Sequence, residues 1–256
     1  MAADTELTVV QVYPELLGTY GDRGNALALV HRARGRGLRT RVVDVAPDHP
    51  VPRHGDIYLL GGGEDAAMLL AFAHLRADGG LEAAVSDGAV CLGVCAGYQL
   101  LSQEFAGPDG AHHQGLGLLD VTCDRLAGAR AVGEVLAEGA GSAGSGFLTG
   151  FENHQGDATL GAEARPLGLL VRGVGNGDGT TEGAVQGRVV ATYLHGPVLV
   201  RNDELADHLL QLVTGPLPPF VDRPVQRLRG ERRRAALGHG RPWWRRQSGR
   251  RQVRSR

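Results

Sequence analysis

Short apolar segments alternate with segments of helical pattern through the first hundred residues of the chain. Strands are predicted at 6–14, 39–45, 56–63 and 88–94, and helices at 26–37, 64–75 and 96–105. Strands that are apolar at nearly every position are typical of a parallel sheet covered by helices on both faces. Further strand patterns at 118–123, 130–138, 168–177 and 183–196 precede a predicted closing helix at 202–213. The sequence therefore predicts an α/β fold with a mainly parallel open sheet flanked by helices and a strand-rich second half.

Length and cysteine content indicate a soluble protein of a reducing compartment. The 256 residues are enough for one large domain with a packed core, and three cysteines are too few for a disulfide framework. No apolar run reaches the roughly 18 residues that span a bilayer. The N-terminus lacks the basic region and apolar core of a signal peptide. We expect a cytoplasmic protein.

Charge is distributed unevenly along a chain whose net charge is −1. Residues 221–256 hold 13 arginines and two acids, whereas residues 1–220 carry a net charge of −12. The end of the chain has almost no large apolar residues besides Trp243 and Trp244, so it is not expected to fold alone. The alternative to a tail without function is that its arginines give weak, salt-sensitive attraction to nucleic acid or an anionic membrane. We predict a domain at 1–214 and a basic, disordered tail at 215–256.

The segment Gly93-Val94-Cys95-Ala96-Gly97 has the pattern of a nucleophile elbow, with cysteine where hydrolases carry serine. In this turn from strand to helix only small neighbours avoid clashes, and the nucleophile is exposed at the carboxyl edge of the sheet. The N-terminus of the following helix would favour the thiolate. Ligands of open α/β sheets bind at the same edge. Cys95 is therefore predicted to be a nucleophile.

Other roles for the cysteines are less well supported. Free cysteine is often a small buried hydrophobic residue, and this is the role predicted for Cys91, which lies inside the strand. A zinc site is disfavoured because no second pair of cysteines or histidines stands at ligand spacing nearby. No metal ligand is predicted.

A cysteine nucleophile needs a base, and two of the ten histidines are candidates. His195 ends an apolar segment in a Tyr-Leu-His-Gly-Pro turn, so it can face the same sheet edge as Cys95. His154 lies in the segment Gly-Phe-Glu-Asn-His-Gln-Gly, which is typical of a polar loop. His195 is the preferred base.

Four motifs together resemble one enzyme family. They are GVCAGYQLL at 93–101, GGGED at 61–65, TGFENHQG at 149–156 and YLHGP at 193–197. Over about residues 6–214 the chain is similar to class I, triad-type glutamine amidotransferases of the cobyric-acid-synthase-like branch, which have a flavodoxin-like sheet. The leading YGDRGN at 20–25 and the short, self-standing domain narrow the resemblance to glutaminase subunits that act on lipid II together with a Mur-ligase-like synthetase.

This resemblance implies a glutaminase mechanism. Cys95 would attack the side-chain amide of glutamine to give a glutamyl thioester and ammonia, and His195 would transfer protons and then activate water. Backbone N–H groups of Gly62, Gly63 and Ala96 would form the oxyanion hole.

Two further residues match positions at which the family binds its substrate. Gln99, one helical turn beyond Cys95, resembles the position that contacts glutamine. Arg130 resembles the arginine that holds the α-carboxylate, a task to which a planar guanidinium is suited. An ordinary surface arginine is the alternative.

One departure from the family concerns the acid of the triad. Many relatives carry an acid two residues after the histidine, whereas Gly196 and Pro197 follow His195 here. Glu152, another carboxylate of the chain, or a carboxylate of the partner could orient the imidazole, or a Cys–His dyad could suffice. A partner's carboxylate is the first hypothesis, because it would make activity depend on the complex.

The resemblance also implies the reaction partners. Ammonia would pass to a Mur-ligase-like subunit of a heterodimer, which amidates the α-carboxyl of D-glutamate in the lipid II stem peptide. The chain has no Gly-x-x-x-x-Gly-Lys-Ser/Thr phosphate loop, so no cofactor is expected in it, and ATP and Mg²⁺ are expected on the partner. The complex would bring this cytoplasmic chain to the inner face of the membrane, and no nucleic-acid partner is expected. A subunit of a cobalamin-type synthase, forming cobyric acid or an a,c-diamide, and a non-catalytic binding module of the same fold are the alternatives.

Overall fold

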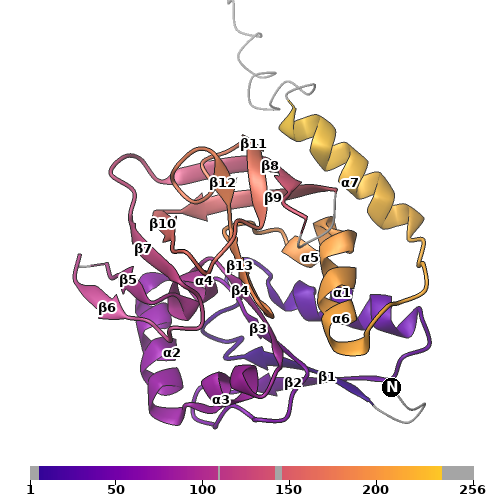
Figure 1. Cartoon of the computed structure of the whole chain (residues 1–256), viewed down its shortest axis with the longest axis horizontal. Helices are drawn as coiled ribbons and strands as arrows, with labels where there is room; N and C mark the ends of the chain where they lie inside the picture. Colours follow the sequence, from indigo (N-terminus) through magenta and orange to yellow (C-terminus); the bar gives the residue numbers. More distant parts are fainter. Residues whose placement is uncertain (1–5, 109, 142–145, 238–256) are drawn as a thin grey trace, which may run out of the picture.

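The computed structural model describes residues 6–108, 110–141 and 146–237 of the chain (Figure 1). Its main sheet has six strands in the order β13-β14-β4-β3-β1-β2. All neighbouring pairs are parallel except β13 with β14. The strands are β1 (Leu7–Val12), β2 (Thr40–Val45), β3 (Ile57–Leu60), β4 (Val90–Val94), β13 (Ala184–Gln186) and β14 (Val189–Thr192). The predicted fold class is confirmed.

Helices cover both faces of this sheet (Figure 1). They are α1 (Arg23–Arg34), α2 (Asp65–Asp78), α3 (Gly80–Ser86), α4 (Ala96–Leu101), α5 (Val198–Arg201) and α6 (Asp203–Thr214). Helix α1 packs with α5 and α6, whereas α2 packs with α3 and α4. The chain moves from β1 to β2 in one direction along the sheet and from β3 to β4 in the other. Because such crossovers are right-handed, the two sets of helices fall on opposite faces.

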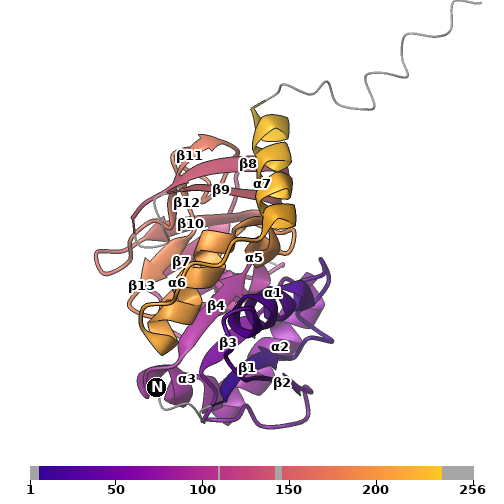
Figure 2. The same ribbon diagram turned by 90° about the vertical axis from the view of Figure 1, so that its right-hand side faces the viewer.

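The second half of the chain adds two four-stranded sheets. One has the order β10-β7-β5-β6, built from β5 (Glu104–Ala106), β6 (His112–Gln114), β7 (Val121–Arg125) and β10 (Gly156–Leu160). The other has the order β12-β11-β8-β9, built from β8 (Ala131–Gly139), β9 (Phe147–His154), β11 (Gly168–Arg172) and β12 (Thr181–Glu182). Figure 2 shows β8, β9, β11 and β12 on one side of the main sheet, away from β1 and β2.

The helix predicted at 96–105 is too long. Helix α4 ends at Leu101, and the Gln103 N–H donates to the carbonyl of Val121 at 2.8 Å. Residues 104–106 then form β5 beside β7. Pairing with a strand remote in sequence, which a local pattern does not reveal, therefore ends the helix.

The tail predicted to be disordered from residue 215 is ordered in its first part. Residues Arg223–Ala236 form helix α7, which Asp222 caps by accepting from the Val225 N–H at 3.2 Å. The helix packs against α5, β8 and β9 (Figure 2). The rest of the tail, from 238 to 256, lies outside the described residues.

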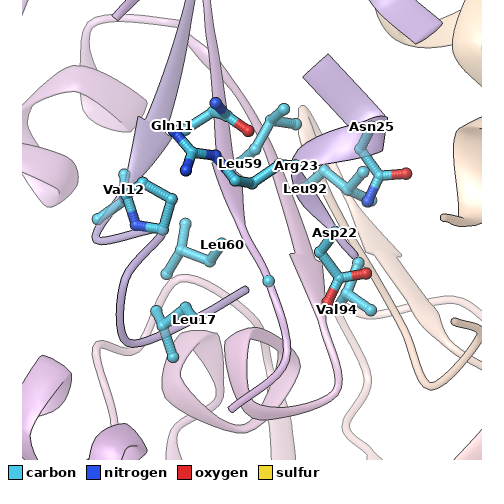
Figure 3. A pocket seen from close by; sticks show the side chains of 12 residues that line it. Gln11, Val12, Leu17, Asp22, Arg23, Asn25, Leu59, Leu60, Leu92 and Val94 are labelled. Carbon is cyan, nitrogen blue, oxygen red and sulfur yellow. The ribbon is translucent and has the colours of Figure 1, made fainter. Parts of the chain in front are cut away.

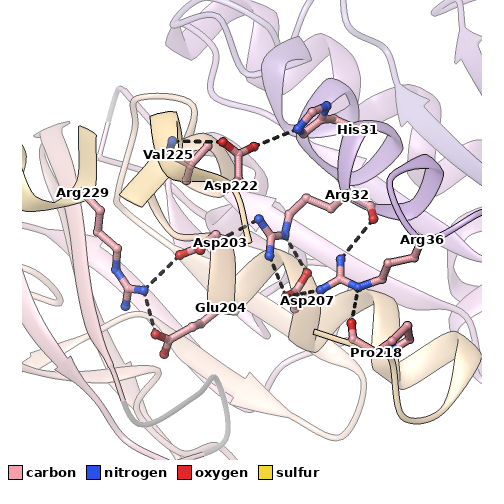
Figure 4. A network of polar contacts seen from close by, with 10 residues as sticks. All are labelled: His31, Arg32, Arg36, Asp203, Glu204, Asp207, Pro218, Asp222, Val225 and Arg229. Carbon is pink, nitrogen blue, oxygen red and sulfur yellow. Dashed lines mark hydrogen bonds and ion pairs between the residues drawn. The ribbon is translucent and has the colours of Figure 1, made fainter. Parts of the chain in front are cut away.

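Arginines of α7 pair with acidic residues of the domain, and this pairing explains why the first part of the tail is ordered. Arg229 donates to Asp203 at 2.9 Å, to Glu204 at 2.7 Å and to the Phe147 carbonyl at 3.0 Å. Asp222 lies 2.8 Å from the ring of His31 on α1 (Figure 4). A segment poor in apolar residues is thus held by the opposite charge of the domain. Within the described ranges no helix has the length and apolar character needed to cross a membrane.

Candidate active site

Cys95 lies in the sharp turn between β4 and α4 with a left-handed backbone, φ 53° and ψ −102°. This conformation is rare for a residue with a side chain and is found in strained nucleophile turns. A Cβ at Gly93 would lie 2.8 Å from the Gly97 carbonyl oxygen, and one at Gly97 would lie 2.5 Å from the carbonyl oxygen of Leu60. Both flanking glycines are therefore required, and the predicted elbow is confirmed.

The thiol of Cys95 is 8% exposed, and its environment does not favour the thiolate. Burial raises its pKa to about 12, and the negative charge of Asp22 adds to this effect. The Ala96 N–H and the charge of Arg130 act in the opposite direction but do not outweigh burial. The expected thiolate is thus wrong for this structure, because a short helix cannot offset the loss of water around a charge. A base must remove the proton during the reaction.

Cys95 opens onto a small pocket whose other walls include Gly63, Gln99, Arg130 and His154. Gln99 and Arg130, both predicted to bind substrate, are thus brought to the cysteine. The Arg130 guanidinium donates to the Asn153 side chain at 2.6 Å and to its carbonyl at 3.1 Å. Arg130 is exposed, but Asn153 of β9 orients its guanidinium.

His195 follows β14, which is the neighbour of β4 in the main sheet. The Cys95 N–H donates to the Thr192 carbonyl at 2.9 Å, and His195 exchanges backbone hydrogen bonds with Phe151 of β9 at 2.9 and 3.0 Å. The ring is 2% exposed, and neither of its nitrogens has a hydrogen-bond partner among the described residues. The predicted base therefore lies at the expected sheet edge with both ring nitrogens available for proton transfer.

His154 is not in a polar loop, as the sequence suggested, but at the end of β9. Its ring stacks on Tyr193 with centroids 3.9 Å apart, and its Nδ1 lies 3.0 Å from the Gly156 carbonyl. His154 lines the pocket beside Cys95, whereas the ring of His195 lies against Gly62 of the glycine turn. Both histidines are therefore candidates for the base, and their separate substitution can assign it.

The carboxylate nearest His195 is Asp22, which the sequence analysis did not single out. Its Oδ2 lies 3.8 Å from His195 Nδ1, and both side chains are buried. Glu152 is instead occupied, because it accepts from the N–H groups of Val174 and Gly175 at 3.0 to 3.1 Å. The motif YGDRGN contained Asp22, but nothing local in it indicated a neighbour 173 positions along the chain.

The glycine turn at 61–63 differs from the predicted oxyanion hole. The Gly62 N–H donates to Asp22 Oδ2 at 2.7 Å and is therefore not available to an oxyanion. Gly63 lines the pocket, and Ala96 directs its N–H to the cysteine. The prediction for Gly62 is corrected, while Gly63 and Ala96 stay candidates. The three glycines are needed chiefly because the turn packs against the carbonyls of Leu16 and Leu17 and against the ring of His195.

A second, very small cavity lies beneath this turn (Figure 3). Asp22 borders it together with apolar side chains such as Leu17 and Leu60 and with the polar side chains of Gln11, Arg23 and Asn25. The side chain of Asp22 is itself 3% exposed and is therefore largely shielded from bulk water. Over the described part of the chain, no three His, Cys, Asp or Glu side chains are grouped so that they could hold a metal ion.

A cysteine elbow at the carboxyl edge of a parallel sheet, with a histidine after the adjacent strand, is the arrangement of enzymes that use a nucleophile elbow. Solved structures support this fold. One described as a glutamine amidotransferase superposes with a TM-score of 0.55 at 22% identity, covering 81% of this chain and 99% of that one. PurLQS from Thermotoga maritima gives 0.54 at 15% identity, covering 82% and 97%.

The chain belongs to the family of CobB/CobQ-like glutamine amidotransferase domains, whose model matches residues 8–203. It is 35% identical over 209 residues to the GatD subunit of lipid II isoglutaminyl synthase (glutamine-hydrolyzing) from Staphylococcus aureus, covering 80% of this chain and 84% of that protein. It is 32% identical over 225 residues to the subunit of the same name from Streptococcus pneumoniae, covering 86% and 84%. A cobyric acid synthase from Sphingopyxis alaskensis is 37% identical over 163 residues, which cover 59% of this chain and 31% of that protein.

Proposed function

We propose that this chain hydrolyses L-glutamine to glutamate and ammonia through a Cys–His thioester mechanism. His195 takes the proton of the Cys95 thiol as the sulfur attacks the side-chain amide carbon. It then gives that proton to the amide nitrogen, which leaves as ammonia while the acyl group stays on the sulfur. A water molecule next gives a proton to His195 and attacks the thioester, and glutamate leaves as the sulfur regains a proton.

One observation carries this proposal. Cys95 lies in a strained turn, and its N–H donates to the carbonyl of Thr192. Thr192 lies three residues before His195. Strain of this kind, of order 1–3 kcal/mol, persists where the surrounding structure holds a functional residue in place. A cysteine whose only role is to pack in the core would not require this backbone strain.

Substrate binding is assigned to the pocket beside Cys95. Arg130 pairs with the α-carboxylate of glutamine, and Gln99 contacts the body of the substrate. The N–H groups of Gly63 and Ala96 stabilise the oxyanion that forms on the amide oxygen. The favourable effect of Arg130 on ionisation of the thiol supports its place near the reacting atoms.

The acceptor of the ammonia is proposed to be lipid II. A Mur-ligase-like, ATP- and Mg²⁺-dependent partner in a heterodimer would amidate the α-carboxyl of D-glutamate in the stem peptide, a step of peptidoglycan biosynthesis in the cytoplasm at the inner face of the membrane. The names of the Staphylococcus and Streptococcus relatives support this acceptor. The matches to these relatives extend over 80% and 86% of this chain, whereas the match to the cobyric acid synthase extends over 59% of it, which also favours the first group.

A cobalamin-type acceptor is the second candidate, supported by the identity of 37% to the cobyric acid synthase. The experiment that tests both uses glutamine labelled with ¹⁵N in its side-chain amide. The full chain is co-purified with a Mur-ligase-like subunit and given ATP, Mg²⁺ and lipid II. Mass spectrometry should find one ¹⁵N atom in the stem peptide, and no label with Cys95→Ala. Label in a corrinoid acid but not in lipid II would overturn the proposed acceptor.

A further inference from the structure

Asn153 lies on β9 between two parts of the active site. In the pairing of β9 with β8 it stands opposite Val132, two residues after Arg130. Two residues before Asn153 on the same strand, Phe151 exchanges backbone hydrogen bonds with His195 at 2.9 and 3.0 Å. One strand thus borders both the arginine proposed to bind the substrate and the histidine proposed as the base.

The side-chain amide of Asn153 is bonded at both ends. Its Oδ1 accepts from Arg130 Nε at 2.6 Å, and its Nδ2 donates to the hydroxyl oxygen of Tyr20 at 2.9 Å. The backbone carbonyl of Asn153 also accepts from Arg130 Nη2 at 3.1 Å. A guanidinium can only donate, so Oδ1 has to face Arg130 and the NH₂ group has to face Tyr20. The two partners therefore fix the orientation of this amide.

Tyr20 continues the chain of contacts to the histidine. Its ring packs on the imidazole of His195 with centroids 4.4 Å apart and planes inclined at 49°. Both rings lie against the glycine turn, because a Cβ at Gly62 would lie 2.7 Å from His195 Cε1 and 3.4 Å from Tyr20 Cδ2. The hydrogen bond from Asn153 thus holds the outer end of a ring that packs on the imidazole.

A neutral amide suits this position better than a carboxylate would. Arg130 is proposed to bind the α-carboxylate of glutamine, and this pairing uses the positive charge of its guanidinium. The same charge favours ionisation of the Cys95 thiol, although burial outweighs it. An aspartate at position 153 would pair with Arg130 and repel the substrate carboxylate. Asn153 therefore orients the guanidinium and leaves its charge available to the substrate.

We propose that Asn153 is a positioning residue that orients Arg130 toward the α-carboxylate of glutamine and holds Tyr20 against the ring of His195. This role rests on the proposed function, in which Arg130 binds the carboxylate and His195 is the base. The carboxylate and the side-chain amide of glutamine are a fixed number of bonds apart, so reaction requires the two protein groups to be held at a matching separation. An amide bonded toward both of them sets that separation.

The first experiment tests whether Asn153 acts on substrate binding through Arg130. Asn153→Ala, Arg130→Ala and the double variant are compared in the full chain bound to its Mur-ligase-like partner. We expect Asn153→Ala to raise KM for glutamine about tenfold, because a mobile guanidinium loses much of a charge-assisted contact. In the double variant KM should exceed that of Arg130→Ala by less than about twofold, since residues that act as a unit are not additive. The same factor in both backgrounds would overturn the proposal.

The second experiment tests the contact with Tyr20. Tyr20→Phe keeps the ring on His195 but removes the hydroxyl that Asn153 holds. We expect it to lower kcat about tenfold with little change in KM, because small displacements of a catalytic group are costly. Combined with Asn153→Ala, it should lower kcat by little more than either substitution alone. A wild-type kcat in Tyr20→Phe would overturn the link to the histidine.

The third variant, Asn153→Asp, separates positioning from packing. Aspartate has the size of asparagine and can accept from Arg130 and from the Tyr20 hydroxyl. A residue needed only for packing would tolerate this exchange. We expect KM for glutamine to rise at least about tenfold, because the new carboxylate neutralises Arg130, while kcat changes less than about threefold. An unchanged KM would contradict the proposal even if Asn153→Ala did not fold.

The matched control is Gln186→Ala. The side-chain amide of Gln186 also joins distant segments, since its Oε1 accepts from the Asp120 N–H at 2.7 Å. It lies beside Val189, at the start of β14, whereas His195 follows the end of that strand. This variant should keep kcat and KM within about twofold, and partner binding and unfolding temperature are measured for every variant.

The controls also separate the two levels of inference. A wild-type complex without glutaminase activity would end the proposed function itself. An active wild type in which Arg130→Ala raises KM, but Asn153→Ala and Asn153→Asp behave as wild type, would end only the role of Asn153.

Discussion

Cys95 and Thr192 are joined by a backbone hydrogen bond of 2.9 Å between the ends of two adjacent strands. This bond fixes the nucleophile turn of β4 against the segment that leads from β14 to His195. Thr192 is itself held, because its hydroxyl donates to the buried carboxylate of Glu182. Burial raises the pKa of Glu182 to about 7. The distance between the turn at Cys95 and the segment that leads to His195 is therefore set by the sheet rather than by flexible loops.

Substitution of Cys95 should abolish glutamine hydrolysis. Cys95→Ala and Cys95→Ser remove the thiol from the strained turn but leave the packing and the binding of the partner intact. A glutamine-analogue electrophile should label one cysteine, detected by peptide mass spectrometry. Cys91 and Cys123 are fully buried, so a label on either of them would contradict the assignment.

His195→Ala should lower kcat about 10²–10⁴-fold, as loss of a general base does. His154→Ala should retain much more activity, although it removes the stacking on Tyr193 and should reduce thermal stability. Steady-state assays of both variants, with circular dichroism to compare their folding, decide between the histidines. Reversed effects on kcat would make His154 the base, in keeping with its place in the pocket.

Arg130→Ala should act mainly through substrate binding. It should raise KM for glutamine with a smaller loss of kcat, as expected when a contact common to ground and transition states is removed. Arg188→Ala is the control, because Arg188 is an exposed arginine that donates to the Gly88 carbonyl away from the pocket. An unchanged KM in Arg130→Ala would leave Arg130 as a residue that only binds Asn153.

The isolated chain should hydrolyse glutamine slowly, and the Mur-ligase-like subunit should raise the rate. We expect the partner to supply the carboxylate that orients His195, because an imidazole without an oriented carboxylate spends time in the wrong tautomer or rotamer. Glutaminase assays with and without the partner test this, using chains that end at 220 and at 237. Loss of stimulation in the shorter chain alone would show that α7 helps to dock the partner.

The shorter chain should also unfold at a lower temperature. Ending the chain at 220 removes the pairing of Arg229 with Asp203 and of Asp222 with His31, and it uncovers the side of β8 and β9. Differential scanning calorimetry of the two chains measures the change. Equal unfolding temperatures would mean that α7 contributes nothing to the stability of the domain.

Asp207 should make stability depend on pH. Burial would raise its pKa, but the hydrogen bonds from Arg32 and Arg36 outweigh burial and hold the pKa below its usual value. The ionised Asp207 therefore stabilises the folded state above about pH 4, and this contribution is lost as the pH falls through the lowered pKa. Arg32 is 4% exposed and keeps only the longer contact with Asp203, at 3.9 Å, when Asp207 is neutral, so Asp207→Asn should cost about 3 kcal/mol. Urea unfolding at pH 7 and pH 3 should show this difference shrinking at the lower pH, and a constant difference would contradict it.

The elements that define the site follow from short stretches of sequence. Apolar segments gave β1, β3 and β4, and the small residues around Cys95 indicated the elbow because steric exclusion is a local effect. The strands β9 and β10 were missed, since TGFENHQG alternates polar and apolar residues only in part and reads as a loop. Helix α7 was missed because its stability comes from Asp203, Glu204 and other acids outside it.

The sequence by itself determined the nucleophile turn, the α/β class and the first four strands of the main sheet, because these depend on side-chain size and on periodicity over a few residues. The tertiary structure decided which groups meet. It brought Asp22 to His195, used the Gly62 N–H to hold that aspartate, moved His154 into a strand beside Cys95, and fixed the arginines of α7 on the acids of α6. The contact of Asp22 with His195 joins residues 173 positions apart, and only the packing of strands and helices that are distant in sequence selects such pairs.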